Sequence, residues 1–412
     1  MRVEDSFEND RAARIRSLDT SEAEHIYLLD FPGGAKIRLP EVAKVVLQAR
    51  WSGAQFGAIA EELERRDLRR ATAEEVERYF DALTAKIDRY ERSAQTEAEP
   101  MSFGVKVTLF SAERAARIAD RLTWLYERAI AFPLAAVVLA ALVAWAMRAH
   151  GRHTTLDAGG IVLGYALFFA SLIAHEFGHA SACRRYGGES GRIGFTVYLV
   201  FPALFSDVSA AWGFTRAQRV VVDLAGTYVQ GIVGAACVAV WFLTGWEAFS
   251  VATMLMVLTG VFNLNPIFKF DGYWVLADAL GVTNLAQQPQ RLFEHYWGRL
   301  RGRTVRALPW PTWIVAAMGG YTVLTVVVWT YFVARTIASV YPRFVAFATL
   351  SAGVYRHRGI ESAGELRQLL FGTLGLALTI YFLVRIGKLG VTHVRVPWRA
   401  RTPDRGPRED PR

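Results

Sequence analysis

Two histidines and a glutamate lie close together inside a long apolar stretch of the chain. The segment reads His175-Glu176-Phe177-Gly178-His179. Residues four apart on a helix project from one face, so the two imidazoles can bind one zinc ion while Glu176 reaches a metal-bound water. Ionisable side chains are costly in hydrocarbon and normally require a partner or a function. The pattern favours a zinc site over its alternative, a hydrogen-bonded His/Glu cluster without a metal.

An acidic residue further along the chain can complete this metal site. A catalytic zinc usually takes three protein ligands and leaves a fourth position for water. Asp271 follows an apolar run, and Gly272 after it allows close approach of the backbone. The alternatives are an ordinary helix cap or a solvated loop acid. Because the alternation of spans predicted below brings Asp271 to the same side of the membrane as His175, we expect it to be the third ligand.

The two motifs together resemble the site-2 protease family of intramembrane zinc metalloproteases. That family pairs HExxH on one helix with an Asn-x-x-Pro-x-x-x-x-Asp-Gly pattern on a later one. Asn263, Pro266, Asp271 and Gly272 fall on the second pattern, and the resemblance covers roughly residues 158–280.

This resemblance implies a role for each matched residue. One zinc ion per chain would be held by His175, His179 and Asp271, with Glu176 as the catalytic acid/base. Asn263 would be a polar group near the substrate backbone. The implied activity is hydrolysis of peptide bonds in a peptide or a membrane-anchored substrate.

The elements that must position these residues are mainly membrane helices. The chain has 412 residues, 52% of them hydrophobic, and a formal net charge of +9. A helix needs about 20 predominantly apolar residues to span a bilayer. Six runs come near this length, and we expect a multi-pass α-helical membrane protein with a site-2-protease-like core. The runs lie at about 129–147, 158–182, 220–243, 248–268, 311–336 and 367–387.

Residues 1–90 predict a small α+β domain of winged-helix type. Strand patterns at 26–29 and 35–39 flank Pro32-Gly33-Gly34, and three short helical patterns follow. The third opens with the capping-box pattern Thr72-Ala73-Glu74-Glu75. The order is similar to the PqqD-like modules, and this resemblance implies binding of the leader segment of a ribosomally made, modified peptide by strand addition.

The remaining boundaries follow from composition. Residues 91–127 predict a linker and an interfacial helix, because Trp124 and several arginines approach the first span. Residues 128–390 form the expected transmembrane metalloprotease domain, and 391–412 a basic, disordered tail. The β-branched and aromatic content of 194–202 suits the membrane-associated strand region of the resembled family.

The distribution of charge predicts where the site faces. The N-terminus is polar, so no cleavable signal peptide is expected. With residues 1–127 inside, the arginine-rich stretches 184–219 and 269–310 also face the cytoplasm, as the positive-inside rule requires. Arginines at 337–366 weaken this agreement. We therefore expect a bacterial-type inner or plasma membrane, with the N-terminus and the active site toward the cytoplasm.

Composition excludes some partners and leaves others open. The sequence has no basic stripe with interleaved aromatic residues, so nucleic acid is not an expected partner. The two cysteines give neither a disulfide framework nor a cysteine metal site. The expected partners are the lipid bilayer, a peptide or membrane-protein substrate, and a leader peptide on the N-terminal domain. Gly226 and Gly231 are expected to permit close helix packing.

Two other classes of function remain open. The first is a non-proteolytic membrane component for peptide binding, export or immunity, with a structural metal. The second is a transporter that uses His175, Glu176 and Asp271 as a proton relay. Roughly one zinc per chain speaks against the relay, and cleavage of a peptide separates the other two.

Overall fold

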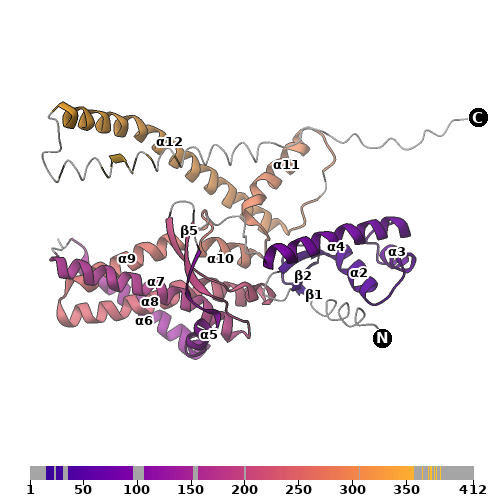
Figure 1. The fold of residues 1–412 in the computed structure, drawn as a ribbon, viewed down its shortest axis with the longest axis horizontal. Coiled ribbons are helices and arrows are strands. Elements are labelled where there is room, and N and C mark those ends of the chain that lie inside the picture. Colours follow the sequence, from indigo (N-terminus) through magenta and orange to yellow (C-terminus); the bar gives the residue numbers. More distant parts are fainter. Residues whose placement is uncertain are drawn as a thin grey trace, which may run out of the picture. The chain divides into compact units, whose positions relative to one another are not determined.

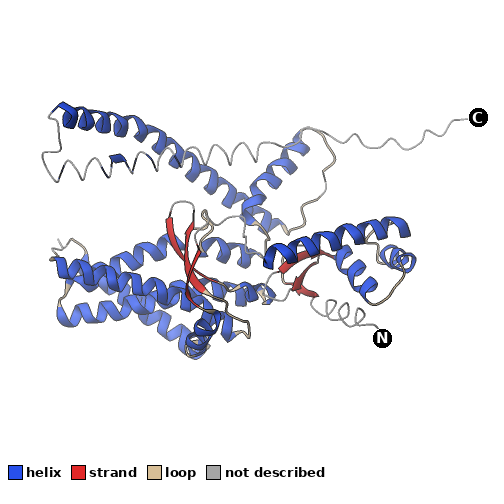
Figure 2. Ribbon diagram, in the orientation of Figure 1, coloured by secondary structure: helices blue, strands red, loops and turns tan. Residues whose placement is uncertain are grey.

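The computed structural model describes residues 15–22, 25–30, 36–95, 106–151, 156–198, 201–305 and 307–356, with a few residues between 364 and 381. Helices predominate there, and the described strands form two three-stranded sheets (Figure 1, Figure 2). The chain divides into two compact units, residues 1–322 and 323–412. The first unit contains all the elements that position the candidate site.

The N-terminal part of the first unit, called the head here (residues 15–95), is a sheet followed by three helices. Its strands pair antiparallel in the order β1-β2-β3, and Ile26 lies opposite Pro40 in the β2-β3 register. The expected strand pair and the three expected helices are therefore present, with β1 as an additional strand. The elements are β1 (Ile15–Leu18), β2 (Ile26–Asp30), β3 (Lys36–Pro40), α2 (Glu41–Trp51), α3 (Phe56–Arg65) and α4 (Ala73–Gln95).

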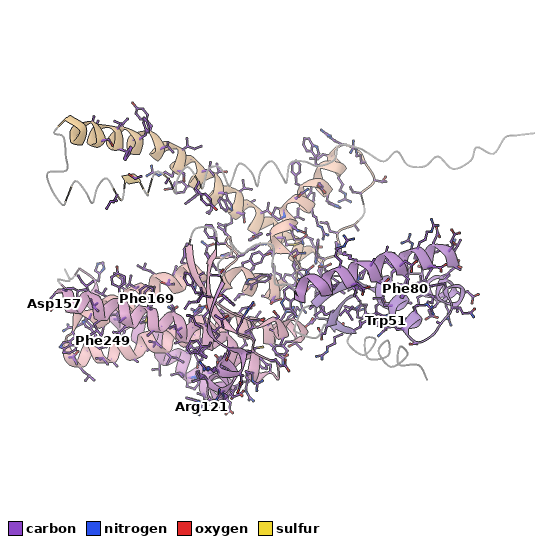
Figure 3. All side chains as sticks on the ribbon, viewed as in Figure 1. Trp51, Phe80, Arg121, Asp157, Phe169 and Phe249 are labelled. Carbon is purple, nitrogen blue, oxygen red and sulfur yellow. The ribbon has the colours of Figure 1, made fainter. Side chains whose placement is uncertain are left out.

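Apolar packing holds the head together. Trp51 of α2 and Phe80 of α4 belong to one cluster with the fully buried Leu47 (Figure 3). The expected capping box forms at the start of α4, where the Glu75 backbone N–H donates to the Thr72 hydroxyl and the Thr72 N–H to the Glu75 carboxylate. Such reciprocal bonds satisfy two of the free N–H groups at a helix start.

The segment expected as linker and interfacial helix contains a strand that joins a second sheet. β4 (Lys106–Phe110) pairs antiparallel with β5 (Ile193–Tyr198), which pairs with β6 (Phe201–Ser206). β5 and the first two residues of β6 overlap the expected strand region at 194–202, and β6 continues beyond it to Ser206. Between β4 and the first membrane helix lie α5 (Ala112–Asp120) and η1 (Thr123–Tyr126). The sheet therefore joins chain that precedes the apolar helices to chain that follows the histidine motif on α7.

Four helices of the described part are long and apolar enough to cross a membrane. They match four of the six expected spans: α6 (Arg128–Ala149), α7 (Ala158–Arg185), α8 (Arg216–Thr244) and Thr312–Thr349 of α12 (Thr312–Arg356). The run expected at 248–268 forms a shorter apolar helix, α9 (Glu247–Asn263), with 17 residues. The expected span at 367–387 lies mostly outside the described residues. The chain is thus a mainly helical protein with the composition of a membrane protein.

The helices α6 to α9 run side by side in one bundle (Figure 1). Large apolar side chains of α6, such as Phe132 and Leu139, remain exposed in the protein, as expected of a surface that meets lipid. The turn from α8 to α9 is tight because Gly245 adopts a left-handed conformation, with φ of 72°. α10 (Asp271–Leu280), η3 (Leu285–Gln287) and α11 (Gln288–Leu300) then lead to α12.

Candidate metal centre

The histidine motif lies on α7, at the end that follows the apolar run. Asp157 caps the start of α7, where its side chain accepts the Gly160 N–H. His175, Glu176 and His179 are all buried, with exposures of 4%, 8% and 8%. Imidazole and carboxylate groups are rarely left without water unless they have partners. The helix therefore presents its three polar groups to the protein interior.

Asp271, from the first turn of α10, meets the two histidines. Its Oδ2 lies 3.0 Å from Nε2 of His175 and its Oδ1 lies 3.5 Å from Nε2 of His179. The two Nε2 atoms are 3.0 Å apart. Four ligands at about 2.0–2.1 Å from a tetrahedral zinc stand about 3.3 Å from one another. The observed separations are close to this value, with a different oxygen of Asp271 facing each histidine.

The hydrogen bonds of the histidines also suit a metal. Nδ1 of His179 lies 2.7 Å from the Val222 carbonyl oxygen, which can only accept, so this nitrogen carries the proton. Nε2 then keeps its lone pair for an ion, and the backbone bond fixes the ring orientation. Nδ1 of His175 is buried and has no hydrogen-bond partner in the described structure. We conclude that the donor set fits a divalent transition metal.

Glycines let α8 pass close to the motif. A methyl group at Gly226 would overlap Nε2 of both His175 and His179, and one at Gly178 would overlap the Ala225 carbonyl. The expectation that Gly226 permits close helix packing is confirmed, but its position adds a second role. Its missing side chain leaves the space in front of the two Nε2 atoms free, and the sequence pattern alone did not indicate this.

The start of α10 is fixed by a similar contact. A methyl group at Gly272 would overlap the backbone of Leu264, so the close approach expected at this glycine is present. Burial raises the pKa of the Asp271 carboxyl, but the two histidines beside it, when they also carry a proton on Nε2, outweigh burial and hold the pKa well below its usual range. Asp271 is therefore a carboxylate, the form that binds a cation.

A buried tyrosine supports the motif from η1. The Tyr126 hydroxyl donates to the Gly178 carbonyl at 2.8 Å and lies 3.0 Å from the Ser181 hydroxyl. Burial raises the pKa of Tyr126, so the hydroxyl keeps its proton and remains a donor. This residue precedes the first span, and no sequence pattern linked it to the histidines.

Asn263 is the last residue of α9 and is partly buried. No hydrogen bond joins its side chain to His175, His179 or Asp271 in the described structure, and its expected role beside the substrate backbone stays a prediction. Glu176 is buried on α7 next to His175, as the motif requires.

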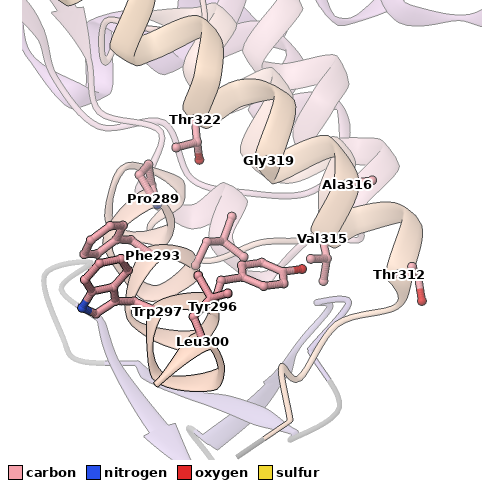
Figure 4. A pocket seen from close by; sticks show the side chains of 11 residues that line it. Pro289, Phe293, Tyr296, Trp297, Leu300, Thr312, Val315, Ala316, Gly319 and Thr322 are labelled. Carbon is pink, nitrogen blue, oxygen red and sulfur yellow. The ribbon is translucent and has the colours of Figure 1, made fainter. Parts of the chain in front are cut away.

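An apolar groove of about 510 Å³ lies away from these residues. Side chains of α11 and the start of α12 line it, among them Phe293, Tyr296 and Trp297 (Figure 4). None of its lining residues is a candidate site residue. The groove therefore gives no information about the chemistry at His175.

Comparisons with known proteins point the same way as the geometry. No family model matches the chain, and no solved structure matches it. A protein of Bacillus subtilis (strain 168) named "Putative peptide zinc metalloprotease protein YydH" is 28% identical over 122 residues. The match covers 29% of this chain and 48% of that protein, so the chain spans about half the length of the relative. A metalloprotease-like function is therefore supported by a distant relative and by a His-His-Asp cluster that can hold a metal.

Proposed function

We propose that this protein is an intramembrane zinc metalloprotease of the site-2 type, in which His175, His179 and Asp271 hold one zinc ion. One observation carries the proposal. The ligand atoms of these three residues lie within 4.8 Å of one another, although the third comes from a different part of the sequence. In the usual chemistry of such a site, the bound zinc lowers the pKa of a water toward about 7 and polarises a carbonyl.

The surrounding residues have separate roles in this proposal. Glu176 takes a proton from the attacking water and later delivers it to the leaving amine. His179 is held in the correct tautomer by the Val222 carbonyl. Gly226 keeps the approach to both imidazoles open. Asn263 binds the substrate backbone, as the sequence resemblance implies.

The substrate in this proposal is a peptide or a membrane-anchored protein. The peptide named in the description of the Bacillus subtilis relative supports this substrate class. We further propose that residues 1–90 bind a leader peptide at a sheet edge of the head, since β1 and β3 are its outer strands. The head and the site face the cytoplasm of a bacterial inner membrane, and maturation or export of a modified peptide is the process served.

Two measurements on the purified full-length protein test the proposal. Metal analysis should find about one zinc per chain in the wild type and none in His179→Ala, because a site of three ligands does not survive the loss of one. A peptide library followed by mass spectrometry should show cleavage by the wild type. Glu176→Gln should retain zinc and lose cleavage, since only the proton acceptor has been removed.

The rival functions predict different results. A protein that binds zinc but cleaves no peptide, with Glu176→Gln indistinguishable from wild type, would be a binding or export component with a structural metal. A protein without zinc would contradict both readings and favour the proton relay.

A further inference from the structure

An arginine of α8 is buried two helical turns before the point where this helix meets the histidines. Arg219 is 5% exposed, and its Nε donates to Oδ1 of Asp278 at 2.7 Å. Its other two nitrogens donate to the carbonyl oxygens of Phe214 and Asp19, each at 2.9 Å. A buried guanidinium needs such a full set of acceptors. From the sequence alone, Arg219 was one of several arginines that predicted a cytoplasmic segment.

The spacing along two helices connects this ion pair to the metal-binding group. On α8, Gly226 lies against the histidines, and Arg219 precedes it by seven residues. On α10, Asp271 lies against the same histidines, and Asp278 follows it by seven residues. The two helices therefore run antiparallel over the same two turns, about 10 Å at 1.5 Å per residue. The Arg219–Asp278 pair fixes how far α10 is shifted along α8.

The head completes the arrangement through the segment Asp19–Glu22. The Asp19 carboxylate accepts the Arg216 backbone N–H at 2.9 Å, at the first turn of α8. The Ser21 N–H donates to the Gly281 carbonyl at 2.9 Å, just after α10. Glu22 accepts the Thr283 hydroxyl at 2.5 Å. This segment therefore binds the ends of both helices that the ion pair aligns.

We propose that Arg219 is a positioning residue, which through Asp278 sets the placement of Asp271 against His175 and His179. The segment Asp19–Glu22 of the head holds Arg219 in place. The inference rests on the proposed metal site but assigns new residues to it. A role in stability alone explains the pair less well, since buried ion pairs are often replaceable by apolar residues without loss of stability.

Zinc affinity tests this inference without reference to catalysis. Purified full-length protein in detergent is titrated with zinc against a chromophoric chelator. We expect Arg219→Gln to lower the zinc affinity about tenfold or more, the range seen when partners of metal ligands are removed. If Arg219 acts through Asp271, adding Arg219→Gln to Asp271→Asn should lower the affinity no further than Asp271→Asn alone.

A matched ion pair on the catalytic helix provides the control. Nε of Arg184 donates to Asp120 at 2.6 Å, but the pair lies beyond the motif and is more exposed. Arg184→Gln should leave the zinc affinity within about twofold of wild type, because exposed pairs contribute little. Asp19→Ala, which releases the head segment, should lower it by a smaller factor than Arg219→Gln.

Each outcome decides for or against the inference. If the wild type binds zinc and Arg219→Gln binds it equally well, or if the losses in the double variant add, Arg219 does not position Asp271. An Asp19→Ala protein with wild-type affinity would contradict the part assigned to the head. A wild type without zinc overturns the metal site itself. Should Arg219→Gln elute as an aggregate, Arg219→Lys keeps the charge, loses the carbonyl contacts and should show an intermediate affinity.

Discussion

The head and the region where α7, α8 and α10 meet are both packed helical structures, but their interiors differ in chemistry. Every buried side chain described in the head is apolar, from Leu18 to Ile87. The buried side chains of the second region include His175, Glu176, His179 and Arg219. Burial of polar groups costs free energy unless each finds a partner. Apolar packing therefore stabilises the head, while polar pairing and close backbone contact shape the candidate metal site.

The largest effect should follow from adding one methyl group beside the histidines. We expect Gly226→Ala to abolish zinc binding, because the methyl group would occupy the space in front of both Nε2 atoms. Gly234→Ala on the same helix is the control, since a methyl group there would meet no atom closer than 3.6 Å. Metal analysis of the two purified variants checks this. Full zinc content in Gly226→Ala would show that the metal does not bind between these imidazoles.

An intermediate effect is expected in the head, and it should alter a different property. Leu47 is fully buried in the head, so Leu47→Ala should destabilise the head by about 2–5 kcal/mol through the cavity it leaves. Where the head is still folded, zinc affinity should be unchanged. Limited proteolysis at increasing temperature measures the stability of the head, and competition with a chelator measures the zinc affinity. The exposed Glu61→Ala is the control. A loss of zinc in the folded Leu47→Ala protein would break the distinction between the two regions.

The smallest effect is expected for a hydroxyl that supports the motif. Tyr126→Phe removes the bond to the Gly178 carbonyl, but Ser181 still donates to that oxygen. We expect a loss of about 0.5–1.5 kcal/mol in unfolding free energy and a small decrease in zinc affinity. Tyr228→Phe, whose hydroxyl makes a longer bond of 3.3 Å to Leu125, should lose less. Thermal denaturation measures both variants. Equal losses of unfolding free energy in Tyr126→Phe and Tyr228→Phe would mean that the Tyr126 hydroxyl does not specifically support the histidine motif.

Local patterns predicted much of this structure. Periodicity and turn residues located β2, β3 and the three head helices, and the length of the apolar runs located four helices long enough to cross a membrane. The capping box at Thr72 formed as its spacing indicates. His175, His179 and Asp271 lie together, as the two motifs predicted, although their role as ligands stays a prediction. Such features depend on neighbouring residues, which a single sequence displays directly.

Features that depend on distant partners were not predictable in this way. β4 lies in a charged segment that reads as a linker, and only β5, beyond two long helices, makes it a strand. Arg219 belongs to an arginine-rich stretch, so its charge indicated a cytoplasmic loop rather than burial. Nothing near Tyr126 indicates that its hydroxyl reaches Gly178. In each case the tertiary fold brings together residues that are far apart in the sequence.

The pairing of β4 with β5 also constrains how the protein is made. β4 leaves the ribosome before α6 and α7, yet its partner follows α7 in the chain. Because synthesis runs from the N-terminus, β4 must wait without its partner until α6, α7 and β5 have been made. If α6 and α7 cross a membrane, as we propose, the strand can pair only when α7 returns to the side where β4 remained. Closure of this sheet would then select chains in which the two helices form a membrane hairpin.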